Sequence, residues 1–248
     1  MYYVGLLYCP SCFTETRCPA IFPRTQPLRS MHPDPASPFP ASAFRRLDEN
    51  PDAEFYRQPR FVTHLDEPAL AAVTQLYREY FKPGSTLLDL MSSWVSHLPA
   101  EVAYARVVGL GMNEQELRAN PRLQAYVVQD LNQNPVLPFA AAEFDGAAIC
   151  VSIDYLTQPV AVLRELARVL RPGAPLVITF SNRCFPSKAI AAWRALDDRG
   201  HLALVDQLLR AAGGWEPSEL LDRSPDPRRS DPLFAVVARA QARGEQAL

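Results

Sequence analysis

The chain has 248 residues, a mass of 27.7 kDa, a net charge of −2 and an isoelectric point near 6.1. This near-neutral balance gives no reason to expect nucleic-acid binding through bulk charge, and the apolar runs have the length of strands rather than of membrane spans. Hydrophobic residues make up 48% of the chain and charged residues 21%, as in soluble globular proteins. We therefore expect a soluble protein with one α/β domain and an extension.

Residues 1–43 form a proline-rich leader without hydrophobic periodicity, which we expect to be disordered. Three interpretations of this leader remain open. It resembles an organellar transit peptide in being poor in acids. It could instead hold a small zinc site, with the ligands Cys9, Cys12, Cys18 and His32. The third interpretation, which we favour, is that the true start is Met31 and the residues before it are an over-long gene model.

The five cysteines suggest no disulfide framework, which favours a reducing compartment. We therefore expect a cytoplasmic protein, with organellar import as the alternative if residues 1–30 are a genuine leader.

A helical cap is expected over residues 44–82, ahead of the sheet. The run Asp66-Glu67-Pro68 is typical of a helix start, because proline is accepted early and acids are favoured in the first turn. The apolar face of this helix consists of Leu70, Val73, Leu76, Tyr77 and Tyr80. Lys82-Pro83-Gly84 then ends the helix near Phe81.

From residue 83 to residue 240, strands and helices alternate, and residues 241–248 are expected to form a flexible tail. Strands are predicted over 86–90, 106–110, 125–129, 146–152, 175–181, 215–221 and 233–238. Helices are predicted over 113–119, 159–170, 186–197 and 202–212. Unbroken apolar strands between helices indicate a doubly wound, mostly parallel seven-stranded sheet. Only a polar loop separates the last two strands, so we expect them to pair as a terminal antiparallel hairpin.

Candidate binding residues lie directly after strands, because an open α/β sheet binds its ligand outside the carboxyl ends of the strands. Asp89 could accept hydrogen bonds from the amino group or hydroxyls of a ligand, or could cap the following turn. Met91, Ser92 and Ser93 follow in that turn. Trp94 could stack on a ligand or pack where the next helix lies.

Five short motifs occur in an order and spacing that belong together. They are Leu88-Asp89-Leu90, Asp130-Leu131, Leu137-Pro138-Phe139, the pair Glu143-Phe144-Asp145 and Ser152-Ile153, and Arg168-Val-Leu-Arg-Pro-Gly173. On these motifs the chain resembles, from about Phe81 to Ser181, the class I S-adenosylmethionine-dependent methyltransferases, in particular the type 11 group that acts largely on small molecules. The resemblance implies a Rossmann-like methyltransferase fold, S-adenosylmethionine as cofactor and a small-molecule or lipid-like methyl acceptor.

The resemblance also implies where the cofactor binds. Asp130 would receive the adenine amino group beside the backbone amide of Leu131. The full set of implied cofactor-binding residues is Asp89, Met91, Ser92, Ser93, Asn113, Asp130, Leu131 and Ser152.

The chain departs from the family at the other end of the cofactor. The family has glycines near positions 91 and 93, because its backbone approaches the methionine moiety closely, and its ribose-binding acid aligns with Gly111. Asn113 or Glu114 could accept a ribose hydroxyl instead. These departures keep a second hypothesis open, a non-catalytic binding or scaffold protein on the same fold. A nicotinamide-dependent oxidoreductase is disfavoured, since no G-x-G-x-x-G turn follows a strand.

Methyl transfer is mainly a matter of positioning, and a base is needed only when the acceptor must lose a proton. The candidates for this role are His64, His97 and Tyr155. The competing interpretation of either histidine is a partly exposed residue that caps a turn. In this fold the segment ahead of the sheet often closes over the ligand, which makes His64, Tyr56 and Arg60 candidate lid groups. Tyr155 lies where the family often contacts its substrate, but without the Asn-Pro-Pro-Tyr run of amide-nitrogen methylation. No metal site is predicted in the folded part, and the oligomeric state stays open.

Overall fold

The computed structural model describes residues 7–8, 38–226 and 228–242. The zinc alternative and the start at Met31 concern residues that lie outside this described part. Within the described residues, no helix combines the length and the apolar character that crossing a membrane requires.

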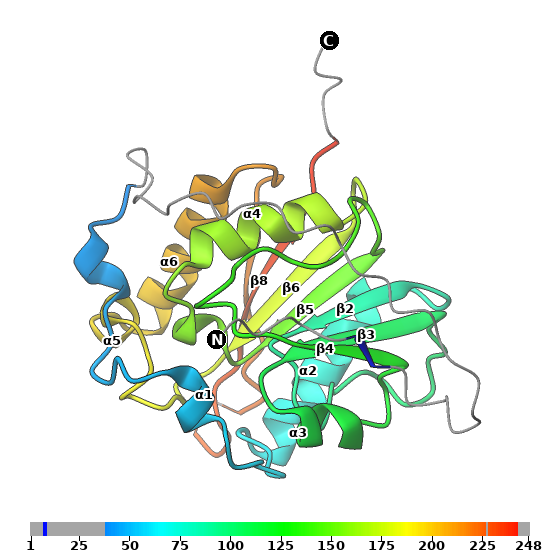
Figure 1. Ribbon diagram of the computed structural model, residues 1–248, viewed down its shortest axis with the longest axis horizontal. Coiled ribbons are helices and arrows are strands. Elements are labelled where there is room, and N and C mark those ends of the chain that lie inside the picture. The colour runs from blue at the N-terminus through cyan, green and yellow to red at the C-terminus, as the bar shows by residue number, and fades with distance from the viewer. Residues whose placement is uncertain (1–6, 9–37, 227, 243–248) are drawn as a thin grey trace.

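A single eight-stranded sheet forms the centre of the molecule, in the order β1-β4-β3-β2-β5-β6-β8-β7 (Figure 1). Its strands are β1 (Leu7–Tyr8), β2 (Thr86–Leu90), β3 (Arg106–Gly111), β4 (Ala125–Val128), β5 (Gly146–Cys150), β6 (Pro175–Phe180), β7 (Glu219–Asp222) and β8 (Phe234–Arg239). Strands β2 to β6 are parallel, while β8 pairs antiparallel with both β6 and β7. The predicted mostly parallel sheet with a terminal antiparallel hairpin is confirmed. The short edge strand β1, antiparallel to β4, was not predicted.

Two layers of helices cover the sheet (Figure 1). Helices α2 (Glu67–Tyr80) and α3 (Glu114–Ala119) lie along one side, and α4 (Pro159–Val169) and α6 (Asp198–Ala212) along the other. The short elements are η1 (Ala41–Phe44), α1 (Asp52–Phe55), η2 (Ile153–Tyr155) and α5 (Ala191–Arg194). All six residues of β6 are buried, as expected for a strand covered on both faces.

Helix α2 forms as its sequence predicts. The Asp66 carboxylate accepts a hydrogen bond from the Ala69 backbone N–H at 3.0 Å and so caps the first turn. Of the predicted apolar face, Val73, Leu76 and Tyr77 are fully or almost fully buried, while Leu70 and Tyr80 are partly buried.

The helix predicted over residues 186–197 is wrong in extent. Only α5, Ala191–Arg194, is helical there, because the chain enters it in extended conformation at Ile190. The Ile190 N–H is donated to the carbonyl of Asp154 and the Ala191 N–H to that of Arg45, so neither can join a continuous helix. The next helix, α6, begins at Asp198 rather than at residue 202, because the Asp197 carboxylate caps it.

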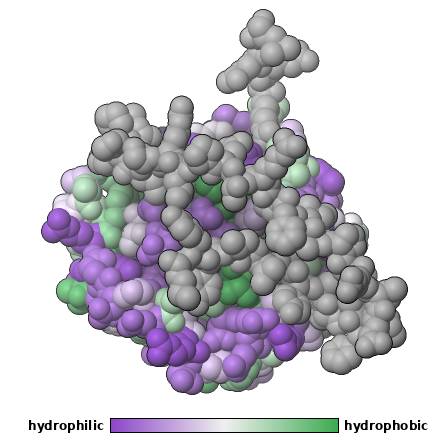
Figure 2. Space-filling model, viewed as in Figure 1, coloured by the Kyte–Doolittle hydropathy of each residue, from purple (hydrophilic) through white to green (hydrophobic). Residues whose placement is uncertain are grey.

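The outer surface is mostly hydrophilic in the view of Figure 2, and its apolar residues lie in small separate patches over the described part. The exposed large apolar side chains are Leu47, Phe61, Val62, Val136, Leu196 and Leu220. Single exposed apolar side chains are normal on a soluble protein.

Candidate functional site

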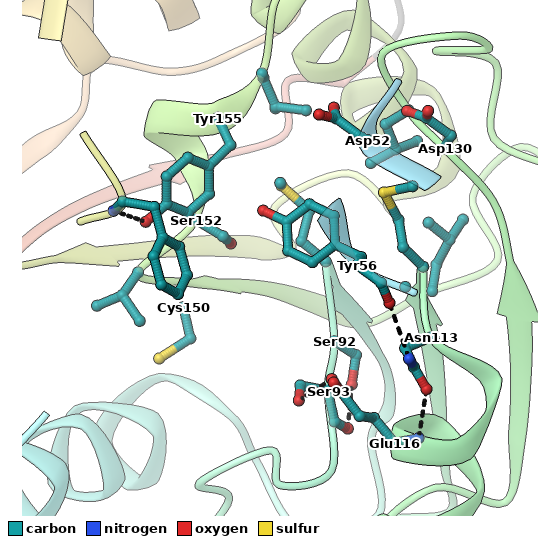
Figure 3. Close-up of a pocket in the computed structure, with 18 of the residues that line it drawn as sticks. Asp52, Tyr56, Ser92, Ser93, Asn113, Glu116, Asp130, Cys150, Ser152 and Tyr155 are labelled. Carbon is teal, nitrogen blue, oxygen red and sulfur yellow. Dashed lines mark hydrogen bonds between the residues drawn. The ribbon is translucent and has the colours of Figure 1, made fainter. Parts of the chain in front are cut away.

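A cavity of about 330 Å³ lies at the carboxyl ends of β2, β3, β4 and β5, a volume within the usual range of small-ligand pockets. Its wall includes the residues that follow these four strands: Met91, Ser92 and Ser93; Met112 and Asn113; Asp130 and Leu131; Ser152. Figure 3 shows Ser92, Ser93, Asn113, Asp130 and Ser152 of this set around one space. Of the implied cofactor-binding residues, all except Asp89 therefore line one pocket.

Asp130 and Leu131 form the end of the cavity that follows β4. The Asp130 carboxylate accepts the Asn132 backbone N–H at 2.9 Å, which fixes the direction of the turn. Burial raises the pKa of Asp130, while its hydrogen bond with the Asn132 backbone opposes the rise. Leu131 is buried and gives this end an apolar floor.

Asp89 is turned away from the large cavity. Its Oδ2 accepts hydrogen bonds from the hydroxyls of Ser92 and Ser96, both at 2.6 Å. Burial raises the pKa of Asp89 to about 6, and the two hydroxyl bonds oppose the rise. Asp89 lines only a small neighbouring cavity beside His97. In this arrangement its carboxylate holds the turn after β2, which is the capping interpretation that the sequence had left open.

The backbone after β2 keeps a glycine-like conformation although glycine is absent. Met91 has φ 57°, in the left-handed region that side chains disfavour. Val151, across the cavity at the end of β5, has φ 42°, and a β-branched residue there is a marked outlier. Such strain concentrates where a ligand site demands a particular backbone path.

The family's ribose-binding acid aligns with Gly111, and here the backbone of Ser92 occupies the space that its side chain would need. A Cβ atom on Gly111 would lie much closer than 3.0 Å to the Ser92 carbonyl oxygen, too close for any real contact. The Ser92 N–H also donates to the Leu110 carbonyl at 2.8 Å. The turn after β2 therefore packs directly on the end of β3. The serine-containing turn and Gly111 are two parts of one change.

Neither substitute considered for that acid has a side chain free to take its place. Asn113 caps α3, since its Oδ1 accepts the N–H groups of Gln115 and Glu116, and its amide donates to the Tyr56 carbonyl at 2.9 Å. Glu114 is exposed and pairs with Arg118 at 2.9 Å.

Glu116, which the sequence analysis missed, is the buried carboxylate of this wall. It is 9% exposed and lines the cavity. Its Oε1 accepts the Arg60 backbone N–H and its Oε2 the Ser93 hydroxyl, both at 2.6 Å. The spacing from Asn113 is that of a capping box, whose acid returns to the first residue of the helix. Here the Glu116 carboxylate instead binds two other segments, the lid segment at Arg60 and the turn after β2 at Ser93.

Residues 46–64, which precede α2 in the chain and which we call the lid, contribute Asp52, Tyr56, Arg60 and His64 to the wall of the cavity. Asp52 anchors the first part of the lid: it is 3% exposed and accepts two bonds from Arg46 Nη1, at 2.7 and 2.8 Å. The Lys188 Nζ, wholly buried, lies 3.2 Å from Asp52 and donates to the Asn50 carbonyl at 2.8 Å. Paired in this way, the buried charges compensate one another.

Asn132 connects this anchor to the sheet. Its amide nitrogen donates to Asp52 Oδ2 at 2.8 Å and to the Tyr155 carbonyl at 2.9 Å. The side-chain oxygen of Asn132 accepts the Thr157 N–H at 2.7 Å. The run Gln129-Asp130-Leu131-Asn132 could have indicated this residue, because it is a polar amide in the turn that follows β4.

The second part of the lid carries aromatic and cationic groups. The Arg60 guanidinium lies 4.4 Å from the centroid of the Phe55 ring and 5.4 Å from that of Phe185, within the range of a cation–π contact. Tyr56 lines the cavity, and its ring projects into it (Figure 3). The indole of Trp94 donates to the Val62 carbonyl at 3.0 Å, so Trp94 holds the lid, a role that neither interpretation of it had foreseen.

Two of the three candidate bases, His64 and Tyr155, line the large cavity, and His97 does not. His64 lines the cavity, and its pKa is lowered by burial and by the Arg60 charge, so the neutral ring that a base requires is favoured. His97 lies in the small neighbouring cavity and does not line the large one. Tyr155 lines the large cavity, but its hydroxyl accepts the Phe185 backbone N–H at 2.9 Å, and burial raises its pKa.

Two buried polar groups near the cavity lack partners among the described residues: Ser152 Oγ and Asp154 Oδ2. Ser152 lines the cavity, although its hydroxyl oxygen itself is almost wholly covered. Asp154 lies in η2, and burial raises its pKa to about 8. Buried polar groups are normally hydrogen-bonded, so the Ser152 hydroxyl in the cavity wall, unpartnered within the described part of the chain, is an exception.

Residues 91–178 match a protein-family model described as a methyltransferase domain. An O-methyltransferase of Pyrenophora dematioidea is 37% identical over 91 residues, which is 35% of this chain and 34% of that protein. A demethylmenaquinone methyltransferase of Corynebacterium kroppenstedtii is 34% identical over 107 residues, 42% of this chain and 46% of that protein. The chain thus spans less than half the length of these curated relatives.

The fold has known counterparts as well. The crystal structure of a SAM-dependent methyltransferase from Aquifex aeolicus superimposes with a TM-score of 0.50 at 18% identity, over 76% of this chain and 97% of that one. At this identity the likeness concerns the fold.

Proposed function

We propose that this chain is a class I S-adenosylmethionine-dependent methyltransferase and that it transfers a methyl group from S-adenosylmethionine to a small-molecule or lipid-like acceptor. The observation that carries this proposal is the single cavity that joins the Met91–Ser93 turn, the Asp130–Leu131 turn and Ser152 at the carboxyl edge of the sheet. That edge is where a doubly wound sheet binds its ligand.

The residues present fit the cofactor. Asp130 would accept the adenine amino group, with the backbone amide of Leu131 beside it. At the other end, the Ser152 hydroxyl, which has no partner among the described residues, can bond a polar group of the methionine part. When bound, S-adenosylmethionine supplies a methyl group already activated on a sulfonium.

The protein's contribution is then to position the reactants and exclude water. Tyr56, Arg60 and His64 bring the lid over the cavity opposite the sheet. For an acceptor that must lose a proton, we propose His64 as the general base, because it lines the cavity and favours its neutral form. His97 faces the smaller cavity and has no such access.

Calorimetric titration with S-adenosylhomocysteine tests the proposal. We expect binding to the full chain, a loss of about tenfold or more in affinity for Asp130→Ala, and no binding of NAD. The matched control is Glu216→Ala, an exposed acid outside the cavity, which should bind as the unaltered chain does.

The second hypothesis, a binding or scaffold protein without methyl transfer, is favoured by one observation: backbone occupies the position of the ribose acid. No detectable binding of S-adenosylhomocysteine at millimolar concentration would refute the methyltransferase proposal and support this one.

A further inference from the structure

We propose that Glu116 holds the ribose diol of the cofactor and, through the same carboxylate, couples cofactor binding to closure of the lid. This inference rests on the proposed function. It assigns to α3 a role that the family gives to the end of the preceding strand, and it adds a link to the lid.

The order of the strands decides where a diol would lie. Strand β3 lies between β4 and β2 in the sheet. A cofactor with its base at Asp130, after β4, and its methionine part at Met91–Ser93, after β2, must therefore cross the end of β3 and the start of α3 with its sugar. The vicinal hydroxyls of a ribose are best held by a carboxylate, which can accept from both.

At this crossing point Glu116 is the carboxylate that lines the cavity. Gly111 has no side chain and no room for one, because of the Ser92 carbonyl. The Asn113 side chain is committed to the helix cap and to the Tyr56 carbonyl. Glu114 is exposed and is paired with Arg118.

The hydrogen bonds of Glu116 leave it able to bind hydroxyls. Each of its two oxygens accepts one bond, from Arg60 N–H and from Ser93 Oγ, and an ionised carboxylate offers about four acceptor positions. Both groups that donate to Glu116, a backbone N–H and a hydroxyl, are uncharged. Among the described residues, no cationic side chain forms an ion pair with Glu116. A diol would occupy the remaining positions.

The bond to Arg60 makes Glu116 a sensor of the lid as well. Two residues of the α3 start hold the lid backbone: Asn113 at the Tyr56 carbonyl and Glu116 at the Arg60 N–H. A sugar that fixes the Glu116 carboxylate in place also fixes the acceptor of the Arg60 bond. We therefore expect diol binding to favour the closed lid.

The test compares S-adenosylhomocysteine with its 2′,3′-dideoxy analogue, by calorimetry, on the full chain and on Glu116→Gln. If Glu116 binds the diol, the substitution weakens S-adenosylhomocysteine about ten- to a hundredfold and leaves the affinity for the dideoxy analogue within about threefold. Equal weakening of both ligands would mean that Glu116 only supports the fold, and would overturn the inference. A loss confined to Glu114→Gln would overturn it too.

Trypsin cleavage in the lid, after Arg57 and Arg60, reports the coupling. We expect S-adenosylhomocysteine to slow this cleavage in the unaltered chain more than the dideoxy analogue does at equal saturation, and the difference to vanish in Glu116→Gln. Equal protection by both ligands would contradict the coupling. Failure of the unaltered chain to bind S-adenosylhomocysteine would instead refute the proposed function, so the two failures are distinguishable.

Discussion

The carbonyl oxygen of Ser92 lies where a Cβ atom on Gly111 would have to be placed. This contact links the two departures from the methyltransferase pattern, because the turn after β2 can rest on the end of β3 only while residue 111 has no side chain. An acidic side chain at position 111, where the family has its ribose-binding acid, is therefore incompatible with the path that the turn after β2 takes here.

Gly111→Ala should therefore destabilise the protein by about 1–3 kcal/mol, the usual cost of overpacking, because the obstructing atom belongs to the backbone. Gly109→Ala is the matched control: its nearest neighbours are the flexible side-chain ends of Leu123 and Leu117. Urea unfolding of both variants gives the comparison. A Gly111→Ala variant as stable as the unaltered chain would show that the turn can move away.

Substitutions at Met91 separate its side chain from its backbone conformation. Met91→Ala and Met91→Gly both remove the side chain, but only glycine adopts φ 57° without strain. We expect the glycine variant to be about 1 kcal/mol more stable than the alanine variant in urea unfolding. Alanine equal to or better than glycine would argue against a left-handed residue 91.

Binding to the same two variants tests what the Met91 side chain does. Tighter binding of S-adenosylhomocysteine by Met91→Gly would mean that the side chain only intrudes on the methionine subsite. Weaker binding by both variants would make it part of a rebuilt pocket wall.

The sheet could be predicted from the sequence because its signals are local. Each strand of the parallel part, such as β6 with all six residues buried, is a short apolar run between polar turns. The start of α2 at the run Asp66-Glu67-Pro68 was equally visible. The prediction of one helix over residues 186–197 was wrong, because the N–H groups of Ile190 and Ala191 donate to the carbonyls of Asp154 and Arg45. Partners so distant in sequence cannot be inferred from a local pattern.

The site was only half predictable for a similar reason. Asp130 and Ser152 line the cavity, and the resemblance to the methyltransferases had implied both as binding residues. Glu116 and Asp52 act through contacts across long sequence separations, such as that from Glu116 to Arg60. Asp89 stands at the predicted position, but its carboxylate is used by Ser92 and Ser96, which only the three-dimensional turn reveals.

The buried Asp154 should make stability depend on pH. Burial raises its pKa from 3.8 to about 8, so between these values the folded protein keeps a proton that the unfolded chain has lost. The stability from this group is fully present below about pH 4 and is lost as the pH rises to about 8. Asp154→Asn cannot ionise, and its melting temperature relative to the unaltered chain should rise by several degrees from pH 5 to pH 8. Asp222→Asn, at an exposed acid, is the control; a flat difference for Asp154→Asn would refute the assignment.

The lid anchor should be sensitive to Lys188. Its buried Nζ lies 3.1 Å from Asp48 and 3.2 Å from Asp52, so Lys188→Met leaves buried negative charge less compensated. We expect a loss of about 3–5 kcal/mol of stability in urea unfolding and weaker binding of S-adenosylhomocysteine. Lys82→Met, at an exposed lysine, should change stability by less than about 0.5 kcal/mol. Equal effects of the two substitutions would show that the anchor contributes little.

A crystal structure of the full chain with S-adenosylhomocysteine tests the central claim most directly. We predict the adenine at Asp130 and Leu131, the ribose hydroxyls on the Glu116 carboxylate, and the homocysteine part along Met91–Ser93 toward Ser152, under a closed lid. A cavity that stays empty at saturating ligand, or a ligand bound away from the carboxyl edge of the sheet, would contradict it.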